Sequence, residues 1–281
     1  YCKSKEIIPL CTPWDLDSLV VLENYGMEAY KVASADLTNN ELLEALAATG
    51  KPLICSTGMS TEAEIKQAAI FLRQHSAQFV MLHCNSTYPT PFKDINLHYL
   101  SRLKNILGIP IGYSGHERGY SIPVVAVGMG AKVIEKHFSI DKSMEGNDHK
   151  VSLLPEEFKE MVNQIRQVEE AMGSSDQRVI SQGESMNRQI LAKSLLINQT
   201  LKEGEIITRD MIAIKSPGQG IQPYHLEALV GKRAQRDFSV GDYFFESDIH
   251  EKRIAPRHYS FRRPFGIPIR YHDYKNLISG T

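Results

Sequence analysis

The first 172 residues repeat one pattern, in which a short apolar run ends in small polar residues and an amphipathic segment follows. The runs end at residues 12, 34, 57, 84, 114 and 137, so successive ends are separated by 22, 23, 27, 30 and 23 residues. This is the length of a strand plus a helix, and apolar runs without polar alternation are typical of strands covered on both faces. We therefore expect strands at 7–12, 29–34, 52–57, 79–84, 109–114 and 132–137 in one parallel sheet.

The segments between the runs carry helix-capping residues. The expected caps are Asp15 before 16–25, Asn39 or Asn40 before 41–49, Thr61 with Glu64 as a capping box, and Pro155 in the first turn before 156–172. No GxGxxG sequence follows any run, which argues against a dinucleotide-binding sheet. The predicted fold is an α/β (β/α)8 TIM-type barrel, of which six units are present and two strands are expected before Tyr1.

The pattern changes after residue 172. We predict a partial barrel domain at 1–172, a polar linker at 173–190 and a small second domain of short strands and glycine turns at 191–251. Residues 252–281 contain seven Lys and Arg against one acidic residue, Asp273. We interpret this last stretch as a basic tail or the start of a further domain, with a partner-binding patch as the alternative.

Overall charge excludes two classes of partner. The 32 basic and 33 acidic residues give a net charge of −1, so no global field attracts nucleic acid or an acidic membrane. No uncharged run reaches the roughly 18 residues of a membrane-spanning helix, and the first residues do not resemble a signal peptide. The four cysteines form no CxxC pair, which favours free thiols in a reducing compartment. We therefore expect a cytoplasmic protein without nucleic-acid or membrane partners.

Polar side chains gather at the ends of the predicted strands. In a parallel barrel the active site lies at the carboxyl ends of the strands. These ends carry Thr12, Lys31, Ser34, Asp36, Ser56, Thr57, Ser86, Tyr88, Ser114, His116 and His137. One lysine among several hydroxyl groups suits an anion such as a phosphate or carboxylate. Each serine or threonine taken alone could equally be a helix cap or a turn residue.

His116 and His137 end successive predicted strands, so both imidazoles could reach one point above the sheet. Two neutral imidazoles with open coordination positions suit a catalytic divalent ion such as Mn, Fe or Zn. A hydrogen-bonded structural pair is the alternative. Asp148 follows in a loop and could add a polar group to the same region, whereas His83, inside an apolar run, is interpreted as structural.

Several longer motifs carry a resemblance to a known family. They are 11–15 (CTPWD), 30–36 (YKVASAD), 56–59 (STGM), 83–89 (HCNSTYP), 112–116 (GYSGH), 133–138 (VIEKHF) and 146–149 (GNDH), followed by 201–204 (LKEG), 215–221 (KSPGQGI) and 229–232 (LVGK). In this order and spacing the first seven resemble the sialic acid synthase family, which condenses phosphoenolpyruvate with N-acetylmannosamine or a related 2-acetamido sugar. The last three resemble the small antifreeze-like (SAF) domain of that family.

The resemblance implies a transferase (EC 2.5.1.-) that forms a nonulosonic acid and phosphate. It implies phosphoenolpyruvate binding by Thr12, Lys31, Ser34, Ser56, Ser86 and Ser114, sugar binding by Asp36, Tyr88 and Asp148, and catalytic roles for Lys31, Asp36, His116 and His137. It also implies Mn²⁺ bound by His116 and His137, with Mg²⁺ and Co²⁺ as alternatives. Finally, it implies a domain-swapped homodimer in which residues 215–221 face the partner's histidine pair.

Three departures from the family pattern matter. The family's opening strands are absent, with an acidic residue and a lysine of the phosphoenolpyruvate site, so activity is expected to need more than this chain. Ser86 stands where many bacterial members have asparagine, and Ser216 stands where many have an arginine that reaches the partner's sugar. Residues 263–272 are similar to the junction before a further isomerase-like domain in longer members.

Two other function classes remain open from the residues. A different metal-dependent barrel enzyme, an isomerase or a hydrolase, could use the same histidines, although such sites usually contain more carboxylate ligands. A non-catalytic binding module built on the second domain is disfavoured, because an ice-binding face would be flat and weakly charged. The charged residues there are Lys202, Glu203, Arg209, Asp210, Arg233, Arg236 and Asp237.

Overall fold

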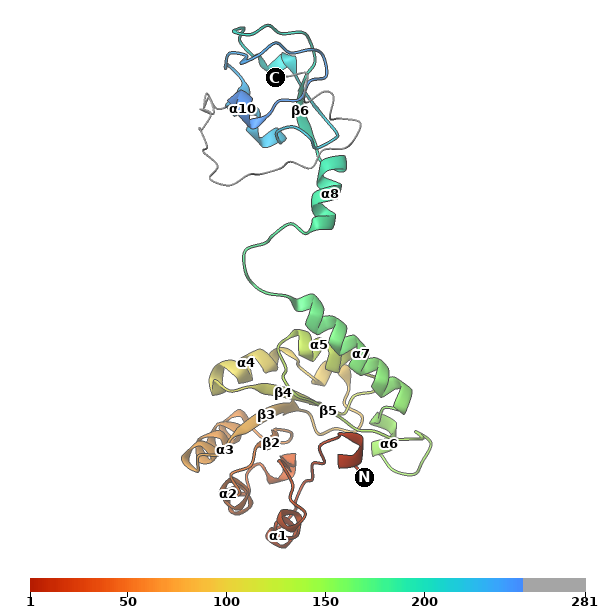
Figure 1. Cartoon of the computed structure of the whole chain (residues 1–281). Coiled ribbons are helices and arrows are strands. Elements are labelled where there is room, and N and C mark those ends of the chain that lie inside the picture. The colour runs from red at the N-terminus through yellow and green to blue at the C-terminus, as the bar shows by residue number, and fades with distance from the viewer. Residues whose placement is uncertain (250–281) are drawn as a thin grey trace, which may run out of the picture. The chain divides into compact units, whose positions relative to one another are not determined.

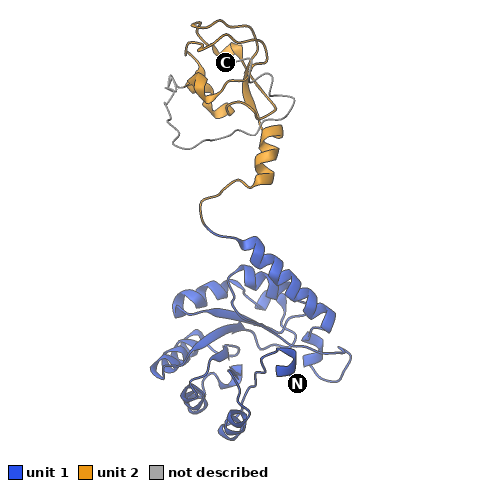
Figure 2. Cartoon of the chain, viewed as in Figure 1, with its two compact units in different colours: residues 1–175 blue, residues 176–281 orange. Residues whose placement is uncertain are grey.

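The computed structural model describes residues 1–249. The chain divides into two compact units, Tyr1–Ser175 and a second unit that begins at Asp176 (Figure 2). The basic stretch at 252–281, with its expected role as a tail or a domain start, lies outside the described residues.

Unit 1 (residues 1–175) is built on a sheet of five parallel strands in the order in which they occur in the chain. The strands are β1 (Tyr30–Val32), β2 (Leu53–Ser56), β3 (Phe79–Cys84), β4 (Ile111–Gly115) and β5 (Ile134–Lys136). All four pairings are parallel, and between β4 and β5 the register sets Ser114 opposite Glu135 and Gly115 opposite Lys136. The predicted α/β class and the parallel sheet are confirmed. The five strands form part of a barrel that is not closed among the described residues.

The strand expected at 7–12 was wrong. Only an isolated parallel bridge between Cys11 and Tyr30 forms there. Ile7 and Ile8 are each 61% exposed, and Leu10 is 47% exposed. Among the described residues no strand pairs on the outer side of this segment, so its apolar side chains are not covered and its backbone has one partner only.

The helices of unit 1 lie in an arc around the sheet (Figure 1). They are α1 (Leu16–Asn24), α2 (Asn40–Ala48), α3 (Glu62–Gln74), α4 (His98–Leu107), α5 (Ser121–Gly128), α6 (Asp148–Val151) and α7 (Pro155–Met172), with short 3₁₀ turns at Lys3–Lys5, Ser34–Asp36 and Phe92–Asp94. The predicted caps are confirmed: Asp15 accepts a hydrogen bond from Ser18, Asn39 caps α2, and Thr61 and Glu64 form a capping box.

The main core of unit 1 lies between the helices and the sheet. Its most completely buried members include Tyr30, Leu43, Leu46, Leu72, Met81 and Leu103, each 0% exposed. A smaller cluster of Leu153, Met161 and Ile165 packs α7 against this body. The apolar faces of the helices and strands are thus buried against each other. The carboxyl ends of the strands lie outside this core, where polar groups are tolerated.

Unit 2 is a small domain with its own core. It contains α8 (Gln182–Leu191), β6 (Ser194–Ile197), β7 (Ile212–Lys215), α9 (Leu226–Leu229) and α10 (Glu246–Ile249), with 3₁₀ turns at Arg209–Met211 and Pro223–His225. Strands β6 and β7 pair antiparallel. Leu195, Ile207, Leu229 and Phe244 are each 0% exposed.

The segment 173–190, predicted as a polar linker, is helical in its second half, because α8 begins at Gln182. The Ser181 hydroxyl accepts from the Glu184 N–H, and the Glu184 carboxylate accepts from the Ser181 N–H. This capping box marks the start of α8. The helix was not predicted because the segment is polar and shows no clear apolar periodicity.

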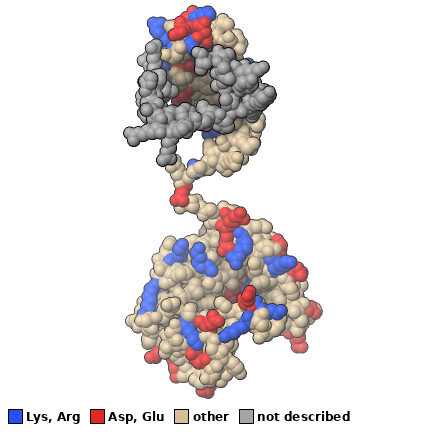
Figure 3. Space-filling model, viewed as in Figure 1, with Lys and Arg blue, Asp and Glu red and all other residues tan. Residues whose placement is uncertain are grey.

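Positive and negative side chains are interspersed over the visible face of unit 1 (Figure 3). Such a surface has no extended area of a single sign. Among residues 1–249, no helix is both long and apolar enough to cross a bilayer.

Candidate active site

A cavity of about 420 Å³ lies at the carboxyl ends of the strands of unit 1. Its lining comes from all five strands or the loops that directly follow them, from the segment after Cys11, and from the first residue of α6. The polar lining residues are Thr12, Lys31, Ser34, Ser56, Ser86, Tyr88, Ser114, His116, Glu135, His137 and Asp148. The structure therefore brings together ten of the eleven residues to which the resemblance assigns a role, and adds Glu135.

One wall of the cavity is lined with hydroxyl groups. Ser56, the last residue of β2, and Ser114, near the end of β4, are each 2% exposed. The Ser56 hydroxyl has no hydrogen-bond partner among the described residues. A buried hydroxyl without a partner loses free energy, so this group is suited to a ligand oxygen.

A glycine lets three strand-end loops meet at this wall. The Gly58 N–H donates to the Ser34 hydroxyl at 3.1 Å. A Cβ at Gly58 would come within 2.1 Å of the Ser86 hydroxyl and 2.8 Å of the Ser34 hydroxyl, so any larger residue would displace both. The close approach of backbone and hydroxyl groups is suited to a phosphate or carboxylate.

Lys31 supplies the positive charge of the cavity. Its ammonium donates to the Val32 carbonyl at 2.8 Å and lies 3.6 Å from the Glu135 carboxylate. Glu135 in turn accepts a hydrogen bond from the Ser114 hydroxyl at 2.8 Å. Sequence reasoning missed Glu135, although a signal was present: side chains alternate along a strand, so residue 135 lies on the same face as His137. An acid inside a predicted strand was a further sign.

The two predicted histidines lie side by side. The rings of His116 and His137 are 5.2 Å apart between centroids and meet edge to face. His116 Nδ1 donates to the Asn85 carbonyl at 2.7 Å, so its Nε2 keeps the lone pair, and the Tyr88 hydroxyl lies 3.0 Å from that atom. His137 Nδ1 lies 3.9 Å from the Asp148 carboxylate. The carbonyl on its Nδ1 orients the His116 imidazole for metal binding through Nε2.

Burial also favours the neutral form of both rings. Loss of solvent lowers the pKa of His116 below its usual value, and the Asn85 carbonyl opposes this shift. Loss of solvent lowers the pKa of His137 as well, with a further contribution from the charge of His116. Neutral imidazoles are the form that binds a metal ion. Burial raises the pKa of Tyr88, so its phenol stays protonated and can donate.

These observations fit a divalent metal site with two protein ligands. Within the part of the chain that the structure describes, no group of three or more His, Cys, Asp or Glu side chains could hold an ion. Two imidazole ligands would leave the other coordination positions to water and substrate, as in catalytic sites that keep open positions.

Asp36 is the predicted site residue that does not line the cavity. Residues Ser34–Asp36 form a 3₁₀ turn, and the Asp36 carboxylate accepts from the Asn39 side chain at 3.3 Å. Its role therefore stays a prediction from the resemblance. Trp14, which lines the cavity and is 65% exposed, was not predicted as a site residue.

Two further predictions concern residues outside this cavity. His83 is structural, as expected: it is 8% exposed, and its Nε2 donates to the Ile95 carbonyl at 2.7 Å. In unit 2, the Ser216 hydroxyl accepts from Lys193 at 2.9 Å and donates to the Leu191 carbonyl at 3.1 Å. Lys215, which precedes Ser216, is exposed at the end of β7.

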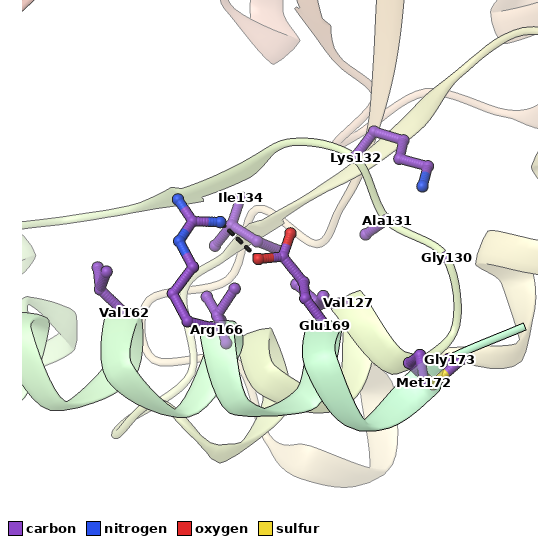
Figure 4. Close-up of a pocket in the computed structure, with 11 residues that line it drawn as sticks. Val127, Gly130, Ala131, Lys132, Ile134, Val162, Arg166, Glu169, Met172 and Gly173 are labelled. Carbon is purple, nitrogen blue, oxygen red and sulfur yellow. Dashed lines mark hydrogen bonds and ion pairs between the residues drawn. The ribbon is translucent and has the colours of Figure 1, made fainter. Parts of the chain in front are cut away.

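A larger cavity, of about 510 Å³, lies between α5, α7 and the segment leading into β5 (Figure 4). Its lining is largely aliphatic, with an Arg166–Glu169 ion pair on α7 at 2.6 Å. None of the predicted site residues lines it. Because it contains neither hydroxyl groups nor histidines, we assign the chemistry to the smaller cavity at the strand ends.

Comparison with known proteins agrees with this assignment. Residues 1–177 match the NeuB family and residues 192–250 match the SAF domain. The chain is 39% identical over 249 residues to N,N'-diacetyllegionaminic acid synthase of Campylobacter jejuni, covering 88% of this chain and 74% of that protein. It is 35% identical over 257 residues to human N-acetylneuraminate-9-phosphate synthase, covering 89% and 71%.

A solved structure of a related synthetase is also similar to this chain. The N-acetylneuraminic acid synthetase of Leptospira borgpetersenii, crystallised with citrate, superposes with a TM-score of 0.62 at 34% identity, over 66% of this chain and 65% of that one. The matches span both units and include the strand ends that form the cavity. This chain belongs to the NeuB family and carries a SAF domain after its barrel unit.

Proposed function

We propose that this protein condenses phosphoenolpyruvate with a 2-acetamido sugar, giving a nonulosonic acid and phosphate. One observation carries the proposal: Lys31, a wall of hydroxyl groups and a pair of adjacent histidines share one cavity. The relatives named as legionaminic and N-acetylneuraminate-9-phosphate synthases support the same reaction class.

Phosphoenolpyruvate would bind on the hydroxyl wall. Lys31 compensates its negative charge, and the unpartnered Ser56 hydroxyl offers a donor that no described residue uses. Ser34, Ser86, Ser114 and Thr12 line the same region and complete the set of donors. A planar anion with a phosphate and a carboxylate needs donors on several sides, which the converging loops provide.

His116 and His137 would hold a divalent cation, for which we propose Mn²⁺. When bound, such a cation acts as a Lewis acid that polarises the sugar aldehyde. Tyr88 and Asp148 line the cavity beside the histidines and would orient the sugar. Asp148 also lies close to His137 Nδ1, so it can fix the orientation of that ring.

In the proposed reaction, carbon 3 of phosphoenolpyruvate attacks the aldehyde carbon of the open-chain sugar. Water then adds to carbon 2, and phosphate leaves with cleavage of the C–O bond. The chain's own contribution is to orient the two substrates and to compensate the charge of the anion during these steps.

We also propose a homodimer in which residues 215–221 of one subunit cover the cavity of its partner. Residues 173–181 can extend over roughly 30 Å and α8 over roughly 15 Å, so the SAF domain can reach beyond its own barrel unit. The cavity at the strand ends is open, and the reaction needs water to be admitted selectively. The four free cysteines support a cytoplasmic location.

The test is product analysis on the full-length protein, with phosphoenolpyruvate labelled with ¹⁸O at the bridging oxygen. We expect one of a panel of 2-acetamido sugars, among them N-acetylmannosamine, its 6-phosphate and precursors of bacterial nonulosonic acids, to give a product with three additional carbons. The label should leave with the phosphate, because the C–O bond breaks. The His137→Ala protein is the matched negative control.

The alternative from the sequence, a metal-dependent isomerase or hydrolase, predicts a different outcome. Such an enzyme would transform a sugar in the presence of metal alone, without consuming phosphoenolpyruvate. Turnover without phosphoenolpyruvate, or no phosphate release with any sugar, would contradict the synthase assignment.

A further inference from the structure

A fully buried ion pair lies directly behind the two histidines. The Lys136 ammonium donates to the Glu117 carboxylate at 2.9 Å, and both side chains are 0% exposed. The same ammonium also donates to the main-chain carbonyl of Glu117. Moving two charges from water into the protein interior costs free energy. The pair therefore needs the close ion-pair and hydrogen-bond geometry seen here to offset that cost.

The pair joins the two strand ends that carry the histidines. Glu117 follows His116 at the end of β4, and Lys136 precedes His137 at the end of β5. Gly115 and Lys136 are register partners in the sheet. Because side chains alternate along a strand, Lys136 points away from the cavity that Glu135 and His137 line. The ion pair and the histidine pair therefore lie on opposite faces of the same two strand ends.

Two neighbouring residues are fitted to this pair. The Tyr113 hydroxyl donates to the Glu117 carboxylate at 2.7 Å, and Tyr113 is 2% exposed. A Cβ at Gly115 would lie 2.7 Å and 2.8 Å from the two Glu117 carboxylate oxygens, so only glycine leaves room for them. Each carboxylate oxygen thus has a charged or neutral donor, which compensates for its burial.

We propose that the Glu117–Lys136 ion pair is a positioning element that sets the spacing and orientation of His116 and His137 for a divalent cation. Each imidazole is adjacent in the chain to one member of the pair, and Lys136 binds the carbonyl of the residue that follows His116. Releasing this link would allow the ends of β4 and β5 to separate. The inference rests on the metal site proposed above.

The experiment measures metal binding directly, with Mn²⁺ alone as the probe and electron paramagnetic resonance as the readout. The variants are Lys136→Met, the double variant Glu117→Gln/Lys136→Met, and the surface control Lys66→Met, whose ion pair with Glu62 is exposed on α3. The double variant removes both buried charges together, so it is expected to fold even where the single variant does not.

We expect the folded variants of the buried pair to bind Mn²⁺ about tenfold or more weakly, the range found for residues that orient metal ligands. Lys66→Met should bind like the wild type. In the metal-free protein, ¹⁵N spectra of the imidazoles should show one tautomer of His116 in the wild type and a mixture in the variants. This second readout does not depend on metal or activity.

Two results would overturn the inference. Wild-type Mn²⁺ affinity in the folded double variant, with lowered thermal stability only, would make the pair merely structural while leaving the metal site intact. Failure of the wild-type protein to bind Mn²⁺ through His116 and His137 would reject the proposed metal site and this inference with it.

Discussion

Lys31 on β1 and Glu135 on β5 come from opposite edges of a five-stranded sheet, yet their charged groups lie 3.6 Å apart. In a flat sheet four strand spacings would separate these edges by roughly 19 Å. The strands must therefore curve around a common interior, as in a barrel. The curvature places a cation, hydroxyl groups and two imidazoles around one cavity.

Replacing Lys31 by methionine should raise the KM for phosphoenolpyruvate far more than the KM for the sugar, because the charge that compensates the anion is removed. Binding can be followed without turnover through Trp14, the single tryptophan of the chain, which lines the cavity. Lys66→Met is the matched control. A structural role for Lys31 would instead lower the melting temperature with nearly unchanged kinetic constants.

Replacing Ser56 by alanine should weaken phosphoenolpyruvate binding without loss of stability, because its hydroxyl has no partner among the described residues. Ser194 is a matched control: it is 0% exposed, and its hydroxyl donates to the Pro217 carbonyl at 2.8 Å. Ser194→Ala should cost about 1 kcal/mol of stability, because that carbonyl loses its partner. Calorimetry and binding titrations distinguish the two variants, and equal destabilisation by both would count against a ligand-binding hydroxyl at Ser56.

Replacing His137 by alanine should abolish turnover and Mn²⁺ binding while leaving the fold intact, since the ring is partly exposed and contributes little core packing. His98→Ala, at an exposed position on α4, is the control and should keep both properties. Circular dichroism checks the fold. Full activity of His137→Ala, or activity unaffected by a strong chelator, is incompatible with the metal assignment.

Acid should destabilise unit 1 partly through His83. Burial lowers the pKa of His83 below its usual 6.5, against the opposing effect of the backbone bond to Ile95. Between that lowered value and 6.5 the unfolded chain binds a proton that the native chain does not, so the free energy of unfolding falls as the pH decreases through this window. One such group contributes at most about 1.4 kcal/mol per pH unit.

The His83→Gln variant should therefore show a shallower pH dependence than the wild type below 6.5, whatever its absolute stability. Denaturant unfolding followed by Trp14 fluorescence measures this slope for unit 1. A slope equal to that of the wild type would mean that other groups, such as His116 and His137, carry the whole dependence.

Mixing two inactive variants tests the proposed dimer. One variant carries His137→Ala in the barrel unit, and the other carries Lys215→Ala and Gln219→Ala in the SAF domain. If each SAF domain completes the partner's cavity, a mixed dimer contains one intact site, and part of the activity should return. A mixture that stays inactive, although subunit exchange is demonstrated, would show that each SAF domain serves its own barrel unit.

Local sequence signals determined most of the secondary structure. The capping residues Asp15, Asn39 and Thr61 predicted where helices begin, because a side chain that satisfies free N–H groups acts over three or four residues only. The apolar runs predicted β1 to β5, because a strand covered on both faces is recognised from consecutive apolar residues and needs no information from distant parts of the chain. The histidine pair followed from strand order and from parallel pairing alone.

Tertiary structure decided what depends on distant partners. Residues 7–12 have the composition of a strand, but a strand needs several consecutive residues paired with a neighbour, and in this segment only Cys11 forms a bridge, to Tyr30. The Lys31–Glu135 contact depends on the curvature of the sheet, and the Glu117–Lys136 pair joins two strand ends whose residues are 19 positions apart in the chain. Strand pairing, sheet curvature and burial depend on contacts between residues that are far apart in the sequence. The partners of Glu135 and Lys136 could therefore be identified only in the folded chain.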